Sequence, residues 1–590
     1  MRLPPAADLA SAAIIIVGIG WIGDIPRILG VPVETERFIA ILLGLALAQA
    51  FLDMAATTTG WRARAGACAA AAAFGVCLWC AVFFYRLNAD LPYLTAEVLI
   101  VSVLLLTGVA VAVWRQDGPT LVLFAAVVAA YAGFGGFLPA TIAPAPLSLA
   151  RMTAYAALDT NGMLGLPLRI AAEVVLAFVL FGQALTWGGG GRVLSGIATL
   201  AMGRFRGGAA KVAVVGSALF GMISGSAVSN ASTIGAMTIP TMRRAGLPAE
   251  VAAAIEATAS TGGQIMPPVM GATAFLMAEF LGVGYSDVVI AAIGPALLFY
   301  LAVFMQVDLA AVRYGIKALS REDIAAQRPP MRSWLLLLPA GVLCLGLLAL
   351  SWRVETAAIV ATVAGLLVSP LANGPWPRPA EIWRLLVAAG RSMGPLLVLS
   401  AIAGVVVGLI NLSGLGLTFT FLLVDLGSSS LLLLLLATAA VAIVLGLGMP
   451  TTAVYVLLAV SFAPPLIKAG VPAMAAHMFV FYYGMLSMIT PPVAFTAMAA
   501  ATIAGANTSR VGWLAMRMSW AAFVLPLLFA TVPALLTPER PLAFVLAFAP
   551  SVLGVVLVTR AIGLVSLSPA RRLVEAAIGA ACLAGIVMLA

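Results

Sequence analysis

A break inside a long apolar run constrains this chain more than any other feature. Residues 251–312 contain no lysine or arginine, yet the stretch TGGQIMPPVMGATAF (Thr261–Phe275) places two glycines and a double proline among them. Proline lacks a backbone donor and clashes with the preceding helical turn, and glycine weakens a helix further. Unpaired backbone groups are costly in hydrocarbon, so a broken helix persists only where protein or a water-filled cavity surrounds it. The stretch therefore predicts a helix break in the interior of a membrane protein.

Composition places the chain in the same class. The 590 residues are 63% hydrophobic and only 9% charged, which is too little charge for the surface of a soluble protein of this length. The net charge of +9 is not gathered into one basic cluster, so it indicates cytoplasmic loops rather than a nucleic-acid surface. The first apolar segment lacks a small-residue cleavage site, so we expect no cleavable signal peptide. A single histidine, His477, does not favour a histidine-based metal or catalytic centre.

Residues 1–142 are predicted to form a block of five spans. The segments long enough to cross a bilayer are Leu9–Gly23, Phe38–Met54, Ala67–Tyr85, Val98–Trp114 and Leu121–Leu138. Arg62, Arg64 and Arg115 lie in the second and fourth loops, which the positive-inside rule assigns to the cytoplasm together with the N-terminus. No polar break interrupts these spans, so we interpret this block as a scaffold and the Pro/Ala-rich residues 143–165 as a connector.

A second interrupted apolar run lies just before the first break. Residues 212–242 are interrupted by SGSAVSNAS (Ser224–Ser232). Basic residues flank the run on both sides: Arg204, Arg206, Lys211, Arg243 and Arg244. Both flanks should therefore lie in the cytoplasm. A segment that enters and leaves on one side is a re-entrant hairpin, with SGSAVSN at its tip near the middle of the membrane.

The same design returns later in the chain. When Pro267-Pro268 is aligned without gaps on Pro491-Pro492, the string IPTMRRAGLPAE falls on APPLIKAGVPAM, and the first tip falls near GMPTTAV (Gly448–Val454). The matched positions are prolines, glycines and flanking bases rather than bulk leucine and alanine. They indicate an internal repeat, each copy holding a hairpin and a broken helix.

Charge patterns predict that the two repeats have opposite topology. From the cytoplasmic Arg243 and Arg244, the first broken helix leads out to Asp287, and Val288–Val307 returns to a basic loop. Three more crossings place the entry of the second hairpin on the periplasmic side. We therefore predict an all-α polytopic membrane protein with about 15 transmembrane helices and two re-entrant hairpins. Inverted repeats with paired broken helices at the midplane are typical of secondary transporters.

This interpretation divides the chain after the connector into four predicted segments. They are the first inverted repeat 166–333 with hairpin 212–242 and broken helix 249–282, linking scaffold helices 334–391, the second inverted repeat 392–537 with hairpin 431–467 and broken helix 474–504, and C-terminal helices 538–590.

The hairpin tips and helix breaks are the predicted site. N-terminal helix ends and their free amides attract carboxylates, while C-terminal ends, unwound carbonyls and hydroxyl oxygens coordinate Na⁺. Candidate solute-binding residues are Ser226, Asn230, Gln264, Thr451 and Thr452. Candidate Na⁺-binding residues are Ser224, Gly225, Ser229, Gly262, Gly263, Pro267, Gly448, Met449, Ser487 and Thr490. Serine and threonine in membrane helices also pack or bond to their own helix, and that alternative stays open for each of them.

The coupling ion is predicted to be Na⁺. Proton relays in membranes usually show chains of Asp, Glu or His. The hairpins and broken helices hold few such groups: Glu256 and Glu279, interpreted as lying near helix ends, and His477 at the start of the second broken helix. This scarcity favours Na⁺ over a proton, and we expect no other cofactor.

Three strings carry a resemblance to a known family. They are ALFGMISGSAVSNASTIGAMTIPTMRRAGLPAEVAAAIEATASTGGQIMPPVMGA, GLGMPTTAVYVLLAVSFAPPLIKAGV and MLSMITPPVAFTAMAAATIAGAN. They resemble the large membrane subunit of tripartite ATP-independent periplasmic (TRAP) transporters, and more specifically permeases in which the small four-helix subunit is fused to the large one. The resemblance covers residues 166–537 well. Members of this family usually have a Val- and Thr-rich string at the first tip, and this chain does not. The resemblance therefore does not fix the solute preference or the ion ligands at this tip.

The resemblance implies Na⁺-driven import of an organic acid, often a carboxylate, across the bacterial inner membrane. A separate periplasmic binding protein, of the TAXI type for fused permeases, would deliver the solute. The hairpins and broken helices would move as an elevator against the scaffold, in contact with membrane lipid.

Three alternatives remain at this point. A stand-alone Na⁺/carboxylate symporter would need no binding protein, although it would not require the five-span N-terminal block. An intramembrane enzyme would need a Ser–His pair or paired aspartates, for which only His477 is available. A channel would conduct without coupling to a gradient.

Overall fold

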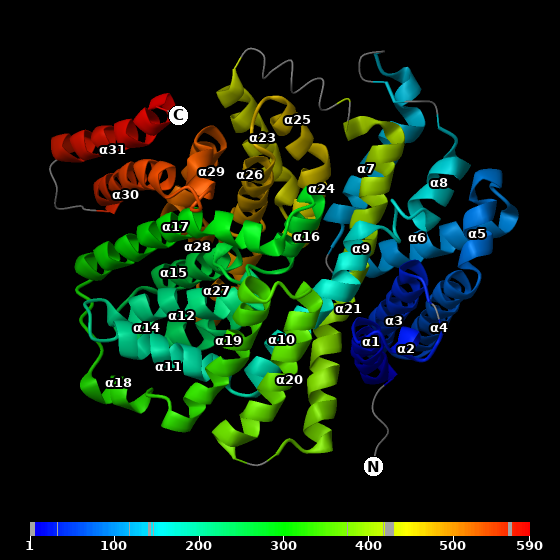
Figure 1. Cartoon of the computed structure of the whole chain (residues 1–590), viewed down its shortest axis with the longest axis horizontal. Coiled ribbons are helices and arrows are strands. Elements are labelled where there is room, and N and C mark those ends of the chain that lie inside the picture. Colours follow the sequence, from blue (N-terminus) through cyan, green and yellow to red (C-terminus); the bar gives the residue numbers. More distant parts are fainter. Residues whose placement is uncertain are drawn as a thin grey trace. The chain divides into compact units, whose positions relative to one another are not determined.

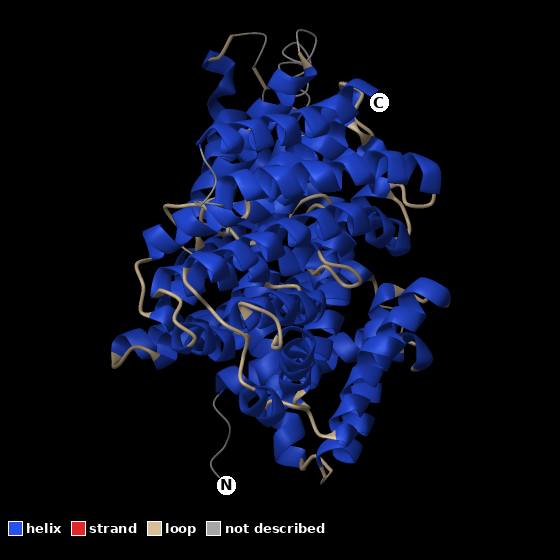
Figure 2. Ribbon diagram, turned by 90° about the vertical axis from the view of Figure 1, so that its left-hand side faces the viewer, coloured by secondary structure: helices blue, strands red, loops and turns tan. Residues whose placement is uncertain are grey.

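The computed structural model describes residues 6–31, 33–116, 118–139, 143–144, 147–374, 376–416, 418, 430–563 and 569–589. Within these ranges the regular elements are helices and no strand is present, which confirms the predicted all-α class (Figure 2). Nine described helices are long and apolar enough to span a membrane, or ten if two helices that meet at a 43° bend count as one span. Parts of the predicted N-terminal block, connector, second repeat and C-terminal segment lie outside the described residues.

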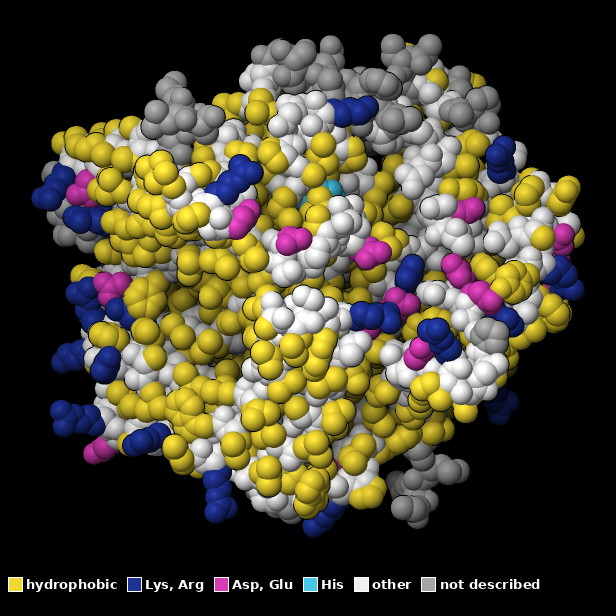
Figure 3. Space-filling view, viewed as in Figure 1, with side chains coloured by type: hydrophobic (Ala, Val, Ile, Leu, Met, Phe, Trp, Pro, Cys, Tyr) yellow, Lys and Arg dark blue, Asp and Glu magenta, His cyan; other side chains and the backbone are white. Residues whose placement is uncertain are grey.

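Apolar side chains dominate the surface. On the face shown in Figure 3 hydrophobic residues cover broad areas, and charged side chains are sparse between them. Large exposed hydrophobic residues include Ile100 at 60% and Val127 at 64% exposure. A water-facing surface would not expose apolar helix faces of this extent, so the chain is a multi-pass membrane protein.

Contacts divide the described helices into two compact units. Unit 1 comprises residues 1–188, 341–423 and 460–462. Its helices are α1 (Ala6–Ile22), α2 (Ile25–Ile28), α3 (Thr35–Ala56), α4 (Trp61–Val82), α5 (Phe84–Asp90), α6 (Ala96–Gln116), α7 (Thr120–Phe134), α8 (Leu149–Leu158), α9 (Leu166–Ile170), α10 (Leu176–Trp187), α20 (Val354–Asn373) and α21 (Pro379–Ser413). Residues 166–188, which the sequence predicts to begin the first repeat, thus pack with the N-terminal helices.

The long helix α21 organises unit 1. It contacts α1, α3, α6, α7, α8 and α10. Small residues permit these close approaches: a Cβ on Gly390 would lie 1.8 Å from the carbonyl oxygen of Ser11, and one on Gly404 would lie 2.4 Å from that of Gly162. Arg391 adds an ion pair at 2.7 Å to Asp8 of α1. Helices in a membrane associate mainly through such close packing, because lipid supplies little hydrophobic drive.

Unit 2 comprises residues 189–340, 424–459 and 463–590. Its helices are α11 (Gly190–Met202), α12 (Gly208–Ser224), α13 (Ala227–Thr233), α14 (Gly235–Arg244), α15 (Ala249–Gly262), α16 (Ala272–Leu281), α17 (Tyr285–Arg313), α18 (Arg321–Ala326), α23 (Leu431–Gly446), α24 (Thr451–Ser461, with its last two residues in unit 1), α25 (Ala463–Lys468), α26 (Ala473–Leu486), α27 (Phe495–Ala504), α28 (Thr508–Met518), α29 (Trp520–Thr531), α30 (Pro541–Gly563) and α31 (Pro569–Leu589). The short α19 (Leu338–Cys344) joins the two units.

Within unit 2 the two broken helices cross-pack. Helix α15, the first half of one, contacts α27, the second half of the other, and α16 contacts α26 in the reciprocal way (Figure 1). Helix α17 runs beside both α15 and α30. Each break is therefore covered by protein on several sides, which satisfies the condition under which a membrane helix can be interrupted.

Candidate functional site

The first hairpin turns at a glycine. Helix α12 ends at Ser224, and Gly225 adopts the left-handed conformation with φ 61°. Ser226 then caps α13, its side-chain oxygen accepting a hydrogen bond from the backbone N–H of Ser229 at 3.3 Å. The chain continues through α13 into α14, and α14 packs back against α12. This is a helix–turn–helix at the predicted tip, while its re-entrant path through the membrane stays a prediction.

The first break follows α15. A single 3₁₀ turn, Gly263–Ile265, ends the helix, and α16 begins only at Ala272. Met270 and Gly271 both have positive φ, 57° and 84°. The hydroxyl of Tyr285 donates to the carbonyl oxygen of Pro268 at 2.8 Å and lies 2.5 Å from that of Val269. The interrupted backbone is therefore held by a side chain of α17 where helical bonds are missing.

Tip and break meet through glycine backbones. A Cβ on Gly225 would lie 2.3 Å from the Cα of Gly271, and a Cβ on Gly221 would lie 2.5 Å from the Cα of Gly263. Real Cβ atoms do not occupy such distances, so side chains larger than hydrogen are excluded on these four residues unless the backbone moves. The structure thus places the predicted Gly225 and Gly263 in two neighbouring backbone contacts, Gly225 with Gly271 and Gly263 with Gly221.

Three side-chain oxygens around this contact are buried without a hydrogen-bond partner in the described chain: Ser224 Oγ, Asn230 Oδ1 and Gln264 Oε1. Asn230 is fully buried and fixed in orientation, because its Nδ2 donates to the carbonyl oxygen of Ser217 at 2.8 Å. Gln264 is 5% exposed. Burying an unpaired polar oxygen costs free energy. Neutral oxygens of this kind suit a hard monovalent cation or a donor group of a solute.

The second repeat has the same layout with different side chains. Helix α23 ends at Gly446, Gly448 has φ 77°, and α24 begins at Thr451. A Cβ on Gly446 would lie 2.6 Å from the Cβ of Ser487, in the second break. Met449 is buried, and so is Thr451, whose Oγ1 has no partner among the described atoms.

Several predicted ligands of the second break bond to their own helix. Ser487 Oγ donates to the carbonyl oxygen of Gly484 at 2.6 Å, and Thr490 Oγ1 donates to that of Leu486 at 2.8 Å. Such a hydroxyl can still offer its lone pairs to a ligand, but its position is explained without one.

The remaining predicted residues differ in exposure. Thr452 is half-buried on α24. In the first repeat, Ser226 and Ser229 are exposed, and Gly262 packs against Phe299.

A buried carboxylate was misplaced by the sequence interpretation. Glu256 does not lie near a helix end; it sits in the middle of α15 with 0% exposure. Its Oε1 accepts from Ser217 Oγ at 2.5 Å and Ser260 Oγ at 2.9 Å, and Thr238 Oγ1 lies 2.5 Å from Oε2. Ser260, four residues on, was the available sequence signal, because positions i and i+4 share a helix face. Ser217 and Thr238 come from both arms of the hairpin, a tertiary contact that no local pattern reveals.

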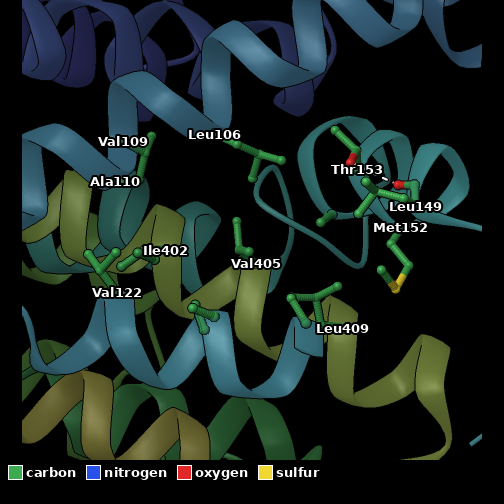
Figure 4. A pocket seen from close by; sticks show the side chains of 14 residues that line it. Leu106, Val109, Ala110, Val122, Leu149, Met152, Thr153, Ile402, Val405 and Leu409 are labelled. Atoms are coloured by element: carbon green, nitrogen blue, oxygen red, sulfur yellow. Dashed lines mark hydrogen bonds between the residues drawn. The ribbon is translucent and has the colours of Figure 1, made fainter. Parts of the chain in front are cut away.

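A pocket among the helices of unit 1 does not resemble a polar site. A cavity of about 220 Å³ in unit 1 is lined by apolar side chains of α6, α7, α8 and α21 (Figure 4). The hydroxyl of Thr153 on its wall donates to the carbonyl oxygen of Leu149 at 2.8 Å. Carboxylates and cations need several convergent polar groups, so the tip–break pairs of unit 2 are the better candidate. Among the described residues no group of three or more His, Cys, Asp or Glu could hold a metal.

Comparison with protein families matches residues 98–537 to the family described as tripartite ATP-independent periplasmic transporter, DctM component. A protein of Sinorhizobium fredii named y4mL is 34% identical over 165 residues, 28% of this chain and 35% of that protein. The C4-dicarboxylate TRAP transporter large permease protein DctM of Pseudomonas aeruginosa is 32% identical over 158 residues, 27% of this chain and 35% of that protein. The matched regions thus span about a third of the length of these two relatives.

Among solved structures, the YdaH transporter of Alcanivorax borkumensis aligns with 70% of this chain and 96% of its own, at 18% identity and a TM-score of 0.46.

Proposed function

Because the chain belongs to the DctM component family of tripartite ATP-independent periplasmic transporters, we propose that it imports an organic acid across the bacterial inner membrane in symport with Na⁺. It is a transport protein and not an enzyme. The observation that carries the ion assignment is the set of buried, unpaired oxygens of Ser224, Asn230 and Gln264 beside the first break. Na⁺ at these oxygens would offset their burial and place positive charge next to a carboxylate solute.

The solute and its delivery follow from the same proposal. We expect a periplasmic binding protein, of the TAXI type, to present the solute, and the N-terminus to be cytoplasmic. A relative named for C4-dicarboxylates makes succinate the first solute to test. Unit 2, which holds the first hairpin, most of the second and both broken helices, would be the moving part of an elevator mechanism. The exposed hydroxyls of Ser226 and Ser229 at the first tip, and Thr452 at the second, would contact the solute carboxylates.

The test is uptake of radiolabelled succinate by the full chain in proteoliposomes. Four arms combine an inward Na⁺ gradient, or none, with a loaded binding protein, or none. Uptake in the arm with both is expected. Equal uptake without binding protein would support a stand-alone symporter, and uptake that persists without Na⁺ would contradict Na⁺ coupling.

Proton coupling is a second candidate, favoured by Glu256. Thr238 Oγ1 lies 2.5 Å from Glu256 Oε2 and 3.0 Å from the carbonyl oxygen of Ile234, and one hydroxyl proton serves only one of them. With Glu256 protonated, Oε2–H donates to Thr238, which donates to Ile234, while Oε1 accepts from the two serines. With Glu256 ionised, all three hydroxyls donate to the carboxylate. Both forms are fully hydrogen-bonded, as a proton carrier requires.

The variant Glu256→Gln distinguishes Na⁺ coupling from proton coupling. The amide preserves shape and hydrogen bonding but carries no exchangeable charge. If Na⁺ alone drives uptake, the variant keeps Na⁺-driven uptake and the wild type shows none from a pH gradient in Na⁺-free buffer. If a proton drives uptake, the wild type responds to that pH gradient and Glu256→Gln does not.

A further inference from the structure

A polar cavity lies in unit 2, away from the tip–break contact. It measures about 360 Å³ and is lined by Ile239, Pro240, Arg243 and Arg244 of α14 and by Ile503 of α27. Basic side chains gather along the left-hand edge of the face shown in Figure 3, where Figure 1 places the ends of α11, α14 and α18. The cavity therefore combines two guanidinium groups with apolar walls.

The two arginines keep unused donors. Arg243 Nη1 donates to the carbonyl oxygen of Ala504 at 3.0 Å, and Arg244 Nη2 donates weakly to Thr241 Oγ1 at 3.4 Å. Neither guanidinium forms an ion pair with a described residue; the neighbouring Glu250 pairs instead with Arg510 at 3.8 Å. Each guanidinium has five N–H donors and a planar fork that matches a carboxylate. The pair is thus charged, anchored and able to take an anion.

An exposed stripe connects the first hairpin tip with this cavity. Helices α13 and α14 follow one another with only Ile234, itself in helical conformation, between them. Spaced three to five residues apart, the exposed positions Ser226, Ser229, Ser232, Met237, Pro240 and Arg244 fall on one helical face. The face begins at the proposed solute contacts and ends at the arginines.

The second repeat lacks the basic pair. The alignment of the two double prolines places Ile467 and Lys468 where the first repeat has Arg243 and Arg244. The second repeat thus keeps one base where the first has two, and a solute that leaves on one side needs an anion site on that side only. The charge count places Arg243 and Arg244 at the cytoplasmic end of the hairpin.

We propose that Arg243 and Arg244 form a release site that receives the solute carboxylate after it leaves the first tip and before it enters the cytoplasm. This inference rests on the proposed function, since it requires a carboxylate solute. The apolar walls of Ile239 and Ile503 would take the carbon chain while the guanidinium forks take the carboxylate. Positive charge at this mouth also raises the local concentration of an anionic solute.

The binding test needs no transport. Arginines of the full chain in phosphatidylcholine nanodiscs are modified with phenylglyoxal, with and without succinate, and each site is read by mass spectrometry. We expect saturating succinate to slow modification of Arg243 and Arg244 by about fivefold or more and to leave Arg321, exposed on α18, unchanged. No protection by succinate overturns the proposal, and protection only by added phosphatidylglycerol assigns the cavity to a lipid phosphate and overturns it as well.

The transport test compares matched variants. In counterflow from succinate-loaded proteoliposomes, the double variant Arg243→Gln/Arg244→Gln should raise the internal half-saturation concentration about tenfold and leave the external one unchanged. Lys468→Gln, at the equivalent place in the second repeat, should change neither. Protection from phenylglyoxal without any uptake would refute only the proposed function. Uptake with no protection and an unchanged double variant would refute only the release site.

Discussion

The two repeats share a backbone and differ in chemistry. Both hairpin tips contact their breaks through a glycine, and the positive φ of Met270 recurs at Ala494, the equivalent position of the second repeat. The polar cluster around Glu256 does not recur. The positions equivalent to Ser217, Thr238, Glu256 and Ser260 are Val441, Phe462, Val480 and Gly484. Both copies therefore have interrupted helices, whereas only the first has the buried carboxylate and the three hydroxyls that surround it.

One aromatic cluster is present only in the second repeat. Tyr455 OH lies 2.8 Å from His477 Nδ1, and both residues are buried. Phe280 at the end of the first broken helix packs against the His477 ring, with centroids 6.4 Å apart. The positions equivalent to Tyr455 and His477 in the first repeat are Ala231 and Ala253. The comparison teaches that duplication preserved the elements that need glycine and proline and left the buried polar groups free to diverge.

The largest expected effect comes from the shared backbone contact. Gly221→Val would force a branched side chain into the space held by Gly263, and overpacking of this kind costs about 1–3 kcal/mol or more. We expect uptake to be lost and the thermal unfolding midpoint to fall, and Gly446→Val to do the same in the second repeat. Gly75→Ala is the control, because a Cβ there meets nothing within 4 Å. Normal uptake by Gly221→Val would show that the tip–break contact is not needed.

The helix breaks give the second comparison. We expect Pro267→Ala/Pro268→Ala to lower Na⁺ affinity and uptake, because alanine restores a donor and up to about 3 kcal/mol of helix propensity per proline. The carbonyls around Gly262–Met266 would then turn to helical amides. Pro491→Ala/Pro492→Ala should behave alike if each repeat holds an ion site. Unchanged Na⁺ dependence in a variant of normal thermal stability would make that break purely structural.

Sequence alone predicted the all-α membrane class and the places where α15 and α26 stop, because proline and glycine act locally. It also identified Asn230 at the first tip and Gln264 at the first break as candidate solute-binding residues. It did not reveal the hydroxyls around Glu256, since Ser217 and Thr238 approach this carboxylate only through the packing of the hairpin. Nor did it separate Ser487 and Thr490, which bond to their own helix, from Ser224, whose oxygen has no partner in the described chain. The grouping of residues 166–188 with the N-terminal helices likewise depends on contacts with α20 and α21.

A smaller effect is expected from one unpaired oxygen of the first break, that of Gln264. Gln264→Met keeps length and apolar volume and removes one unpaired oxygen. We expect the Na⁺ concentration for half-maximal uptake to rise about tenfold, equivalent to about 1.4 kcal/mol, with little change in thermal stability. Met488, the equivalent residue of the second repeat, provides the matched variant Met488→Leu, which removes no oxygen and should leave Na⁺ dependence unchanged. Equal responses of the two variants would mean that Gln264 is not a ligand.

The smallest effect is expected at the pair that only the second repeat possesses. Tyr455→Phe removes the hydroxyl that lies 2.8 Å from His477 Nδ1 and keeps the ring that packs near Phe280 and Phe481. A single buried hydrogen bond contributes about 0.5–1.5 kcal/mol, and the nitrogen left behind loses its partner. We therefore expect a modest fall in the thermal unfolding midpoint. Na⁺ dependence should not change, because neither residue lies at a tip or a break.

The double variant Tyr455→Phe/His477→Leu should recover part of the lost stability, since removing both partners leaves no unpaired nitrogen. A change in half-saturating Na⁺ in Tyr455→Phe would place this cluster within the ion site, and the divergence between the two repeats would then be functional rather than a consequence of packing.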